Sequence, residues 1–148
     1  MRALLGMMAL LATAGCSTAV ATPDTTHDTI VTTDGPLKLT VSDAPATPGV
    51  MFIAGSVVGG SGMVTAASTR YGSLCSTGVA GHATVSPGAI TLQVTYSDRQ
   101  AVCTQEIRAI SYRAEIGSLA PGIYTVRVVH TNSDGSSGAV LTQQVTIT

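Results

Sequence analysis

The side chains with the greatest capacity for chemistry in this chain are three cysteines and three histidines. Thiolates attack electrophiles, carry acyl chains, pair as disulfides or bind metals, and neutral imidazole accepts protons or binds metals. Zinc sites usually bring their ligands in closely spaced pairs, and the chain has no CxxC or HxxxH spacing. A metal site joining Cys75 and Cys103 to His82 and His130 is therefore a competing interpretation rather than the leading one.

Motifs that place a nucleophile or a phosphate are missing from the sequence. GGSGM at 59–63 lacks the second glycine of a G-x-S-x-G elbow, and no glycine-rich phosphate loop occurs. Glu106 and Glu115 lie nine positions apart on a twisting segment, which does not favour a paired-carboxylate hydrolase. We expect no catalytic residues, no metal and no cofactor. A pocket in which His82 or His130 meets a serine or a carboxylate would favour an enzyme instead.

The N-terminal segment has the features of an export signal. Arg2 precedes an apolar run from Ala3 to Ala14. Twelve helical residues span about 18 Å, less than the roughly 30 Å of a bilayer core, so a secretory signal fits better than a membrane span.

Small residues lead into Cys16 in the sequence TAGC at 13–16, and this resembles the lipobox of bacterial lipoprotein signal peptides. The resemblance implies cleavage before Cys16 and acylation of its sulfur. Thr13 stands where that family usually has leucine. Ser17 follows the cysteine, where aspartate resembles an inner-membrane retention signal, so we expect the outer membrane. The alternative is an ordinary signal peptide cut near Ala14 or Ala19.

If Cys16 carries lipid, Cys75 and Cys103 remain as an even pair in an exported domain. The simplest interpretation is a disulfide, because exported chains meet an oxidising compartment. In the chain-entropy description such a loop contributes roughly 3 to 4 kcal/mol.

The charge of the chain limits its partners. Only 10% of the residues are charged, and the formal net charge is −1. Such a surface attracts neither nucleic acid nor an anionic bilayer, so we expect membrane attachment through the lipid and an envelope or extracellular protein as partner.

The chain divides into three parts: a signal peptide at 1–15, a lipidated threonine-rich tether at 16–35, and a β-domain at 36–148. His27 lies in the tether and is expected to be solvated. Strand alternation is seen in three stretches: Leu37, Leu39 and Val41; Ile90, Leu92, Val94 and Tyr96; and Tyr124, Val126, Val128 and His130. GGSG at 59–62 predicts a hairpin turn, and a last strand is expected from about Ala139 to Ile147. The segment 103–116 fits helix or strand spacing, and its β-branched and aromatic content favours strand.

The stretch LAPGIYTVRV at 119–128 resembles the turn before the penultimate strand of immunoglobulin-like, fibronectin-type and prealbumin-like sandwich domains. The resemblance implies a single antiparallel immunoglobulin-like β-sandwich of about seven strands. It also implies that Tyr124 forms a tyrosine corner, in which the hydroxyl hydrogen-bonds back across the turn. A turn of this kind carries no function of its own.

Two further groups of polar residues are candidate sites. Arg108, Arg113 and Arg127 would offer an anion or protein contact if they gathered on one face, although strand arginines more often cover apolar surface. Asn132, Asp134 and Ser137 have too few carboxylates for calcium and predict a polar turn.

We therefore expect a lipid-anchored envelope protein with a non-catalytic binding or structural domain. One alternative is a carbohydrate-binding module, which needs exposed aromatic side chains from the set Phe52, Tyr71, Tyr96, Tyr112 and Tyr124. Another is an accessory or inhibitory subunit of an envelope enzyme, with SLCSTG at 73–78 as the inhibitory loop.

Overall fold

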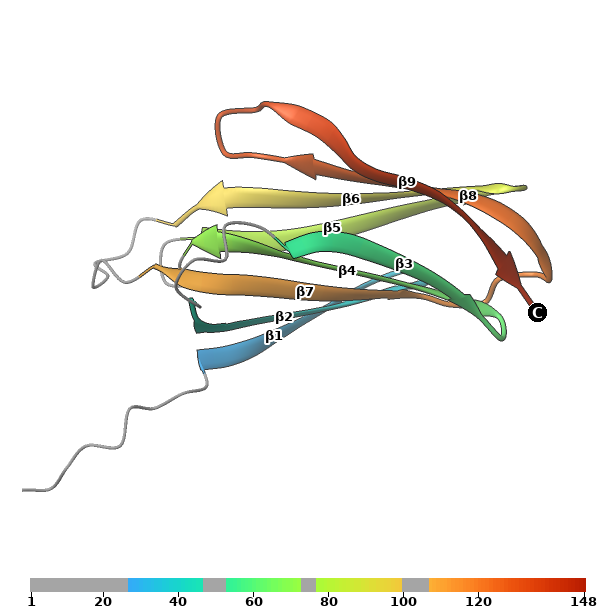
Figure 1. The fold of residues 1–148 in the computed structure, drawn as a ribbon, viewed down its shortest axis with the longest axis horizontal. Coiled ribbons are helices and arrows are strands. Elements are labelled where there is room, and N and C mark those ends of the chain that lie inside the picture. The colour runs from blue at the N-terminus through green and yellow to red at the C-terminus, as the bar shows by residue number, and fades with distance from the viewer. Residues whose placement is uncertain (1–26, 47–52, 73–76, 100–106) are drawn as a thin grey trace, which may run out of the picture.

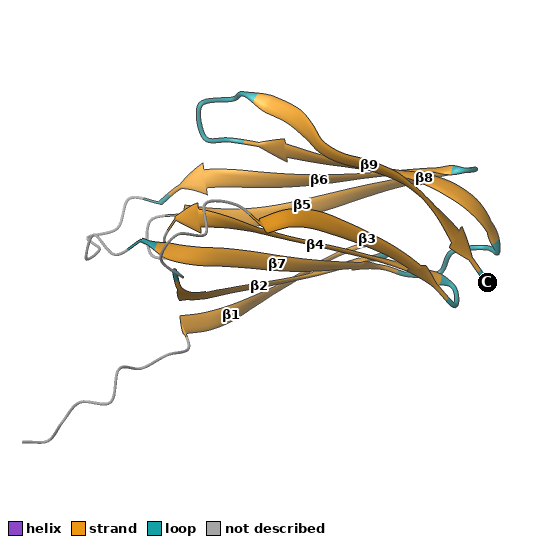
Figure 2. Cartoon of the chain, in the orientation of Figure 1, coloured by secondary structure: helices purple, strands orange, loops and turns teal. Residues whose placement is uncertain are grey.

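The protein folds as a sandwich of two β-sheets. The structure, a computed structural model, describes residues 27–46, 53–72, 77–99 and 107–148. Figure 2 shows strands joined by short turns, and no helix lies in these ranges. The expectation of an all-β sandwich is confirmed.

The two sheets form separate layers (Figure 1). The first sheet holds five strands in the order β1 (His27–Asp34), β2 (Leu37–Pro45), β7 (Arg108–Ile116), β4 (Met63–Gly72) and β3 (Ile53–Gly60). The second sheet holds four, in the order β5 (Thr77–Ser86), β6 (Ala89–Asp98), β8 (Gly122–Thr131) and β9 (Ser137–Ile147). The described residues thus form nine strands where about seven were expected.

One pair of neighbouring strands departs from the antiparallel arrangement. β6 and β8 run parallel, with Leu92 opposite Val128, while every other pair of neighbouring strands in the described ranges is antiparallel. Parallel neighbours need a crossover between them. Here β7 supplies it by crossing to the first sheet between β6 and β8, so the chain re-enters the second sheet in the original direction.

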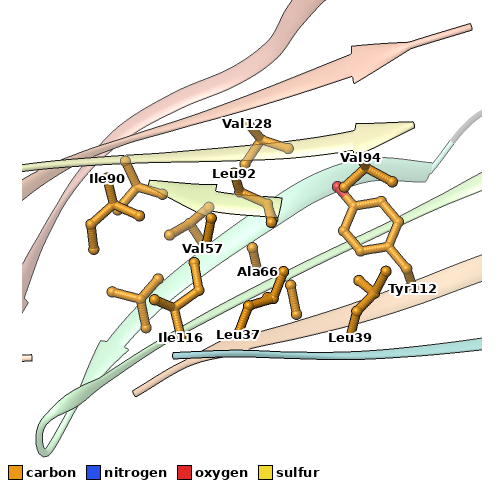
Figure 3. Close-up of a cluster of buried hydrophobic side chains, with 14 of the residues drawn as sticks. Leu37, Leu39, Val57, Ala66, Ile90, Leu92, Val94, Tyr112, Ile116 and Val128 are labelled. Atoms are coloured by element: carbon orange, nitrogen blue, oxygen red, sulfur yellow. The ribbon is translucent and has the colours of Figure 1, made fainter. Parts of the chain in front are cut away.

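The core lies between the sheets and consists of the inward faces of alternating strands. Leu39 and Ile116 from the first sheet face Leu92 and Val128 from the second, and all four are buried (Figure 3). The alternation at 37–41, 90–96 and 124–128 therefore marks the core faces as expected. Each strand turns every second residue inward. These inward residues together form one continuous core, although the chain has few aromatic side chains.

The ambiguous segment at 103–116 is a strand where it can be described. β7 occupies Arg108–Ile116 at the centre of the first sheet, between β2 and β4. Its burial follows the strand period, with Ile110, Tyr112 and Ala114 facing inward, whereas Ile107, part of the helical spacing, lies just before the strand and is exposed. The expected hairpin at 59–62 is also present, and Gly62 adopts a positive φ of 62° in it.

The first strand lies inside the stretch predicted to be a tether. β1 pairs with β2, with Val31 opposite Thr40 and Asp34 opposite Leu37. The folded domain thus includes His27–Asp34, whereas the sequence places its start at residue 36. The alternation was too weak to show this strand, because an edge strand is held largely by backbone hydrogen bonds that any residue except proline can make. Residues 16–26 lie outside the described part.

Candidate functional site

A polar and aromatic cluster closes the space between the sheets at one end of the sandwich. The second sheet contributes Tyr96 and His130, and the first contributes Tyr112 and Arg70. The Tyr112 hydroxyl lies 3.0 Å from His130 Nε2. The His130 ring meets both tyrosine rings edge-on, with centroids 5.3 Å from Tyr96 and 5.6 Å from Tyr112. Figure 3 shows Tyr112 rising from the first sheet toward Val94 of the second.

Arg70 caps this cluster from its exposed side. Its guanidinium carbon lies 4.1 Å above the centre of the Tyr96 ring, a cation–π contact. Its Nη1 donates a hydrogen bond of 3.1 Å to Oδ1 of Asn132, in the turn between β8 and β9. Arg70 therefore ties the first sheet to a turn of the second.

Burial favours the neutral forms of Tyr96, Tyr112 and His130 in this cluster. It raises the pKa of Tyr96 to about 12, although the Arg70 charge opposes this. It also raises the pKa of Tyr112, helped by nearby Tyr96 and opposed by a hydrogen bond with Ser68. Burial and then the Arg70 charge lower the pKa of His130. Neutral tyrosines with raised pKa values are poor nucleophiles, so the cluster is suited to joining the sheets and not to covalent catalysis.

A buried ion pair lies on the inner face of the first sheet. Arg108 Nε donates to Asp43 Oδ2 at 2.9 Å, and the two side chains are only 6% and 2% exposed. Asp43 Oδ1 has no hydrogen-bond partner among the described residues. Asp43 and Arg108 both occupy inward positions of their strands, where apolar side chains are usual.

The three strand arginines do not gather on one face, so that possibility is wrong. Arg108 points into the core, and Arg113 lies on the outer face of the first sheet, where it pairs with Glu115 at 3.0 Å. Arg127 is exposed on the outer face of the second sheet. The strand period of two, together with the crossing of the chain between sheets, separates them.

A histidine and a carboxylate do meet on the surface. His82 Nδ1 of β5 lies 2.5 Å from Oδ2 of Asp34 at the end of β1, and their side chains are 64% and 47% exposed. This contact fixes one ring nitrogen, as a general base needs. Within the described ranges, however, no hydroxyl or thiol is hydrogen-bonded to the ring, and the pair lies in the open. It therefore lacks a nucleophile and a shielded site.

Most of the tyrosines proposed as sugar-binding residues are buried, and Tyr124 makes the hydrogen bond expected of it. Tyr96, Tyr112 and Tyr124 are buried and Tyr71 is half-buried, so the described residues hold no exposed pair of rings for stacking on sugars. Phe52 lies outside the described ranges. The Tyr124 hydroxyl donates a 3.1 Å hydrogen bond to the carbonyl of Ala120, which is the back-bond that defines a tyrosine corner.

The turn between β8 and β9 satisfies its own polar groups. Asn132 Nδ2 donates to Ser136 Oγ, and the Ser136 backbone N–H donates to Asp134 Oδ1. Hydrogen bonds from the Ser136 side chain and then its backbone lower the pKa of the Asp134 carboxyl. In the described part of the chain, no three His, Cys, Asp or Glu side chains are grouped so that they could hold a metal.

The cysteines and the loop 73–76 lie outside the described residues, so lipidation at Cys16 and pairing of Cys75 with Cys103 stay predictions. The strand ends that flank the pair are nevertheless close. Gly72 at the end of β4 lies opposite Arg108 at the start of β7. Gly72, three residues before Cys75, and Arg108, five residues after Cys103, are thus neighbours at one end of the sandwich.

A broad polar face, which the sequence did not predict, lies on the outside of the second sheet. Ladder pairing places Thr84, Thr91, Arg127 and Thr142 in one row across all four strands. We call this the polar face; its exposed members are Thr84, Thr91, Gln93, Arg127, Thr142 and Gln144. Alternation showed the polar half of each strand, but only the pairing register could show that these halves form one surface.

Comparison with protein-family models, curated proteins and solved structures gives no match for this chain. The fold therefore defines the class: an all-β, two-sheet sandwich. None of its described segments forms a helix that is long and apolar enough to cross a bilayer.

Proposed function

We propose that this chain is a lipid-anchored cell-envelope protein with a non-catalytic, immunoglobulin-like binding domain. The observation that carries the proposal is the polar face. Its hydroxyl and amide groups are exposed and lie in register across the four-stranded sheet, with the positive charge of Arg127 among them. Such a face offers many hydrogen bonds with little charge, and it suits a protein surface that contributes a carboxylate opposite Arg127.

The position of β1 fits attachment through Cys16. Ten residues separate Cys16 from His27, and a chain of that length reaches at most about 35 Å. An anchor of this reach holds the domain near the membrane with its sheet faces accessible. Two or three acyl chains give a stable anchor, since each buried methylene contributes about 0.8 kcal/mol.

Mass spectrometry of the protein extracted from membranes tests the anchor. We expect an N-terminal peptide that begins at Cys16 and carries acyl chains. An unmodified N-terminus downstream of Cys16 would refute the lipoprotein part of the proposal.

Site-specific photo-crosslinking in cells tests the polar face. A benzoylphenylalanine at Thr91 is expected to give an adduct with an envelope protein, and Arg127→Ala is expected to remove it. The matched control carries the same probe at exposed Ser56, on the outer face of the first sheet. Equal adducts from both positions, or none from Thr91, would contradict binding through this face.

A further inference from the structure

Strand β9 leaves most of its outer edge open. It lies at the end of the second sheet and pairs only with β8 among the described strands. Its last residues are covered, because Thr148 accepts a backbone hydrogen bond of 3.0 Å from Gly62 in the turn after β3 and donates one of 3.3 Å to Gly60 at the end of β3. From Ser137 to Gln144 every residue is exposed except the half-buried Leu141. Because the backbone groups of successive strand residues point to alternate sides, the residues of this stretch that do not bond to β8 present their N–H and C=O groups to solvent.

This edge lacks most of the usual protections against pairing with another strand. Natural edge strands carry lysine, proline or inward-pointing charges, are very short, or contain a β-bulge, and of these β9 has only the bulge. β9 is eleven residues long and contains no charged residue and no proline. Val140 is the extra residue of this bulge, between Ala139 opposite Val129 and Leu141 opposite Val128, and its apolar side chain is exposed. The edge is therefore built to accept a strand of complementary, uncharged chemistry.

We propose that the partner for this edge is the β9 strand of a second copy of this chain. An antiparallel pair of identical strands about a two-fold axis satisfies the same groups on both copies. With the axis at Leu141, and with Val140 outside the ladder as the bulged residue of each copy, Ser137 lies opposite Gln144 of the partner subunit. No like charges meet across the axis, because β9 carries none.

The expected assembly is a continuous eight-stranded sheet made of two second sheets. Only one strand edge and its side chains are buried, which is less than a typical stable dimer interface, so the dimer is weak and forms with rising concentration. A lipid anchor would favour it by confining both copies to one surface, but the edge itself does not depend on the proposed function.

Sedimentation velocity on the full chain in mild detergent tests the proposal. The wild-type protein is expected to double its mass as concentration rises. Val140→Lys places two lysines beside the axis and is expected to raise the dissociation constant at least about tenfold, because like charges on facing strands repel. Val58→Lys is the matched control, since Val58 is an exposed valine on β3, the edge strand of the other sheet; this variant should dimerise like the wild type.

Hydrogen exchange on the wild-type protein gives a test that needs no variant. Amides within 137–144 are expected to gain protection as the dimer forms. A chain that stays monomeric at all concentrations, a Val140→Lys variant that dimerises like the wild type, or protection confined to another segment would each overturn the proposal. A monomer that instead binds an extended peptide at these amides would assign the edge to a different partner.

Discussion

Breaking the buried ion pair between Asp43 and Arg108 should remove a large part of the stability of this domain. Asp43→Asn keeps the size of the side chain but removes the charge opposite a guanidinium that is 6% exposed. Removing one partner of a buried pair costs about 3 to 5 kcal/mol, and the whole unfolding free energy of such domains is about 5 to 15 kcal/mol. Since asparagine can still accept a hydrogen bond through its amide oxygen, we expect about 3 kcal/mol.

Urea unfolding followed by circular dichroism measures this loss, because the chain has no tryptophan to report by fluorescence. With a slope of about 1.5 kcal/mol/M, a loss of about 3 kcal/mol lowers the midpoint by about 2 M. Glu115→Gln is the matched control. It removes one charge from the exposed pair with Arg113, and exposed pairs are worth at most about 1 kcal/mol. Equal midpoints for the two variants would refute the argument from burial.

A double-mutant cycle separates the pair from its surroundings. Arg108→Met alone should also destabilise the domain, since it leaves the Asp43 carboxylate buried with less compensation. The double variant should cost less than the sum of the two single changes, because the buried charges are removed together. Additive costs would show that the two side chains act independently and that the 2.9 Å contact contributes little.

Three further predictions concern the cluster, the close packing and the thiols. Because the folded state lowers the pKa of His130, the unfolded chain binds the proton first, so stability should be full above about pH 6.5 and decline as pH falls below it. His130→Gln should flatten this decline in urea midpoints measured across the range, and an unchanged slope would exclude His130 as its source. Gly59→Ala should destabilise by about 1 to 3 kcal/mol, since a Cβ there would lie 2.3 Å from the carbonyl oxygen of Thr146, whereas Gly117→Ala, with open space around it, should stay within about 0.5 kcal/mol. Without reductant, Cys75 and Cys103 should resist alkylation, and free reaction of both would remove the predicted disulfide.

The sequence by itself determined the strands of the core. Leu37, Leu39 and Val41, and likewise Ile90, Leu92 and Val94, alternate with polar residues, and strand geometry turns that alternation directly into a buried face and an exposed face. The turn at 59–62 was equally visible, because Gly62 takes a positive φ that favours glycine. These features depend on neighbours in the chain, so local chemistry is enough to predict them.

Only the tertiary structure decided which strands are neighbours and which side chains meet. β1 is recognised through its pairing with β2. The parallel contact of β6 with β8 exists because β7 lies in the other sheet between them in the chain. The polar face exists because the register places Thr91 opposite Arg127. Tyr112 and His130 lie eighteen positions apart on different sheets, and Asp43 and Arg108 sixty-five apart on one. Alternation fixes the face of a strand that each residue occupies, but it carries no information about pairing order, because backbone hydrogen bonds between strands do not depend on which side chains they carry.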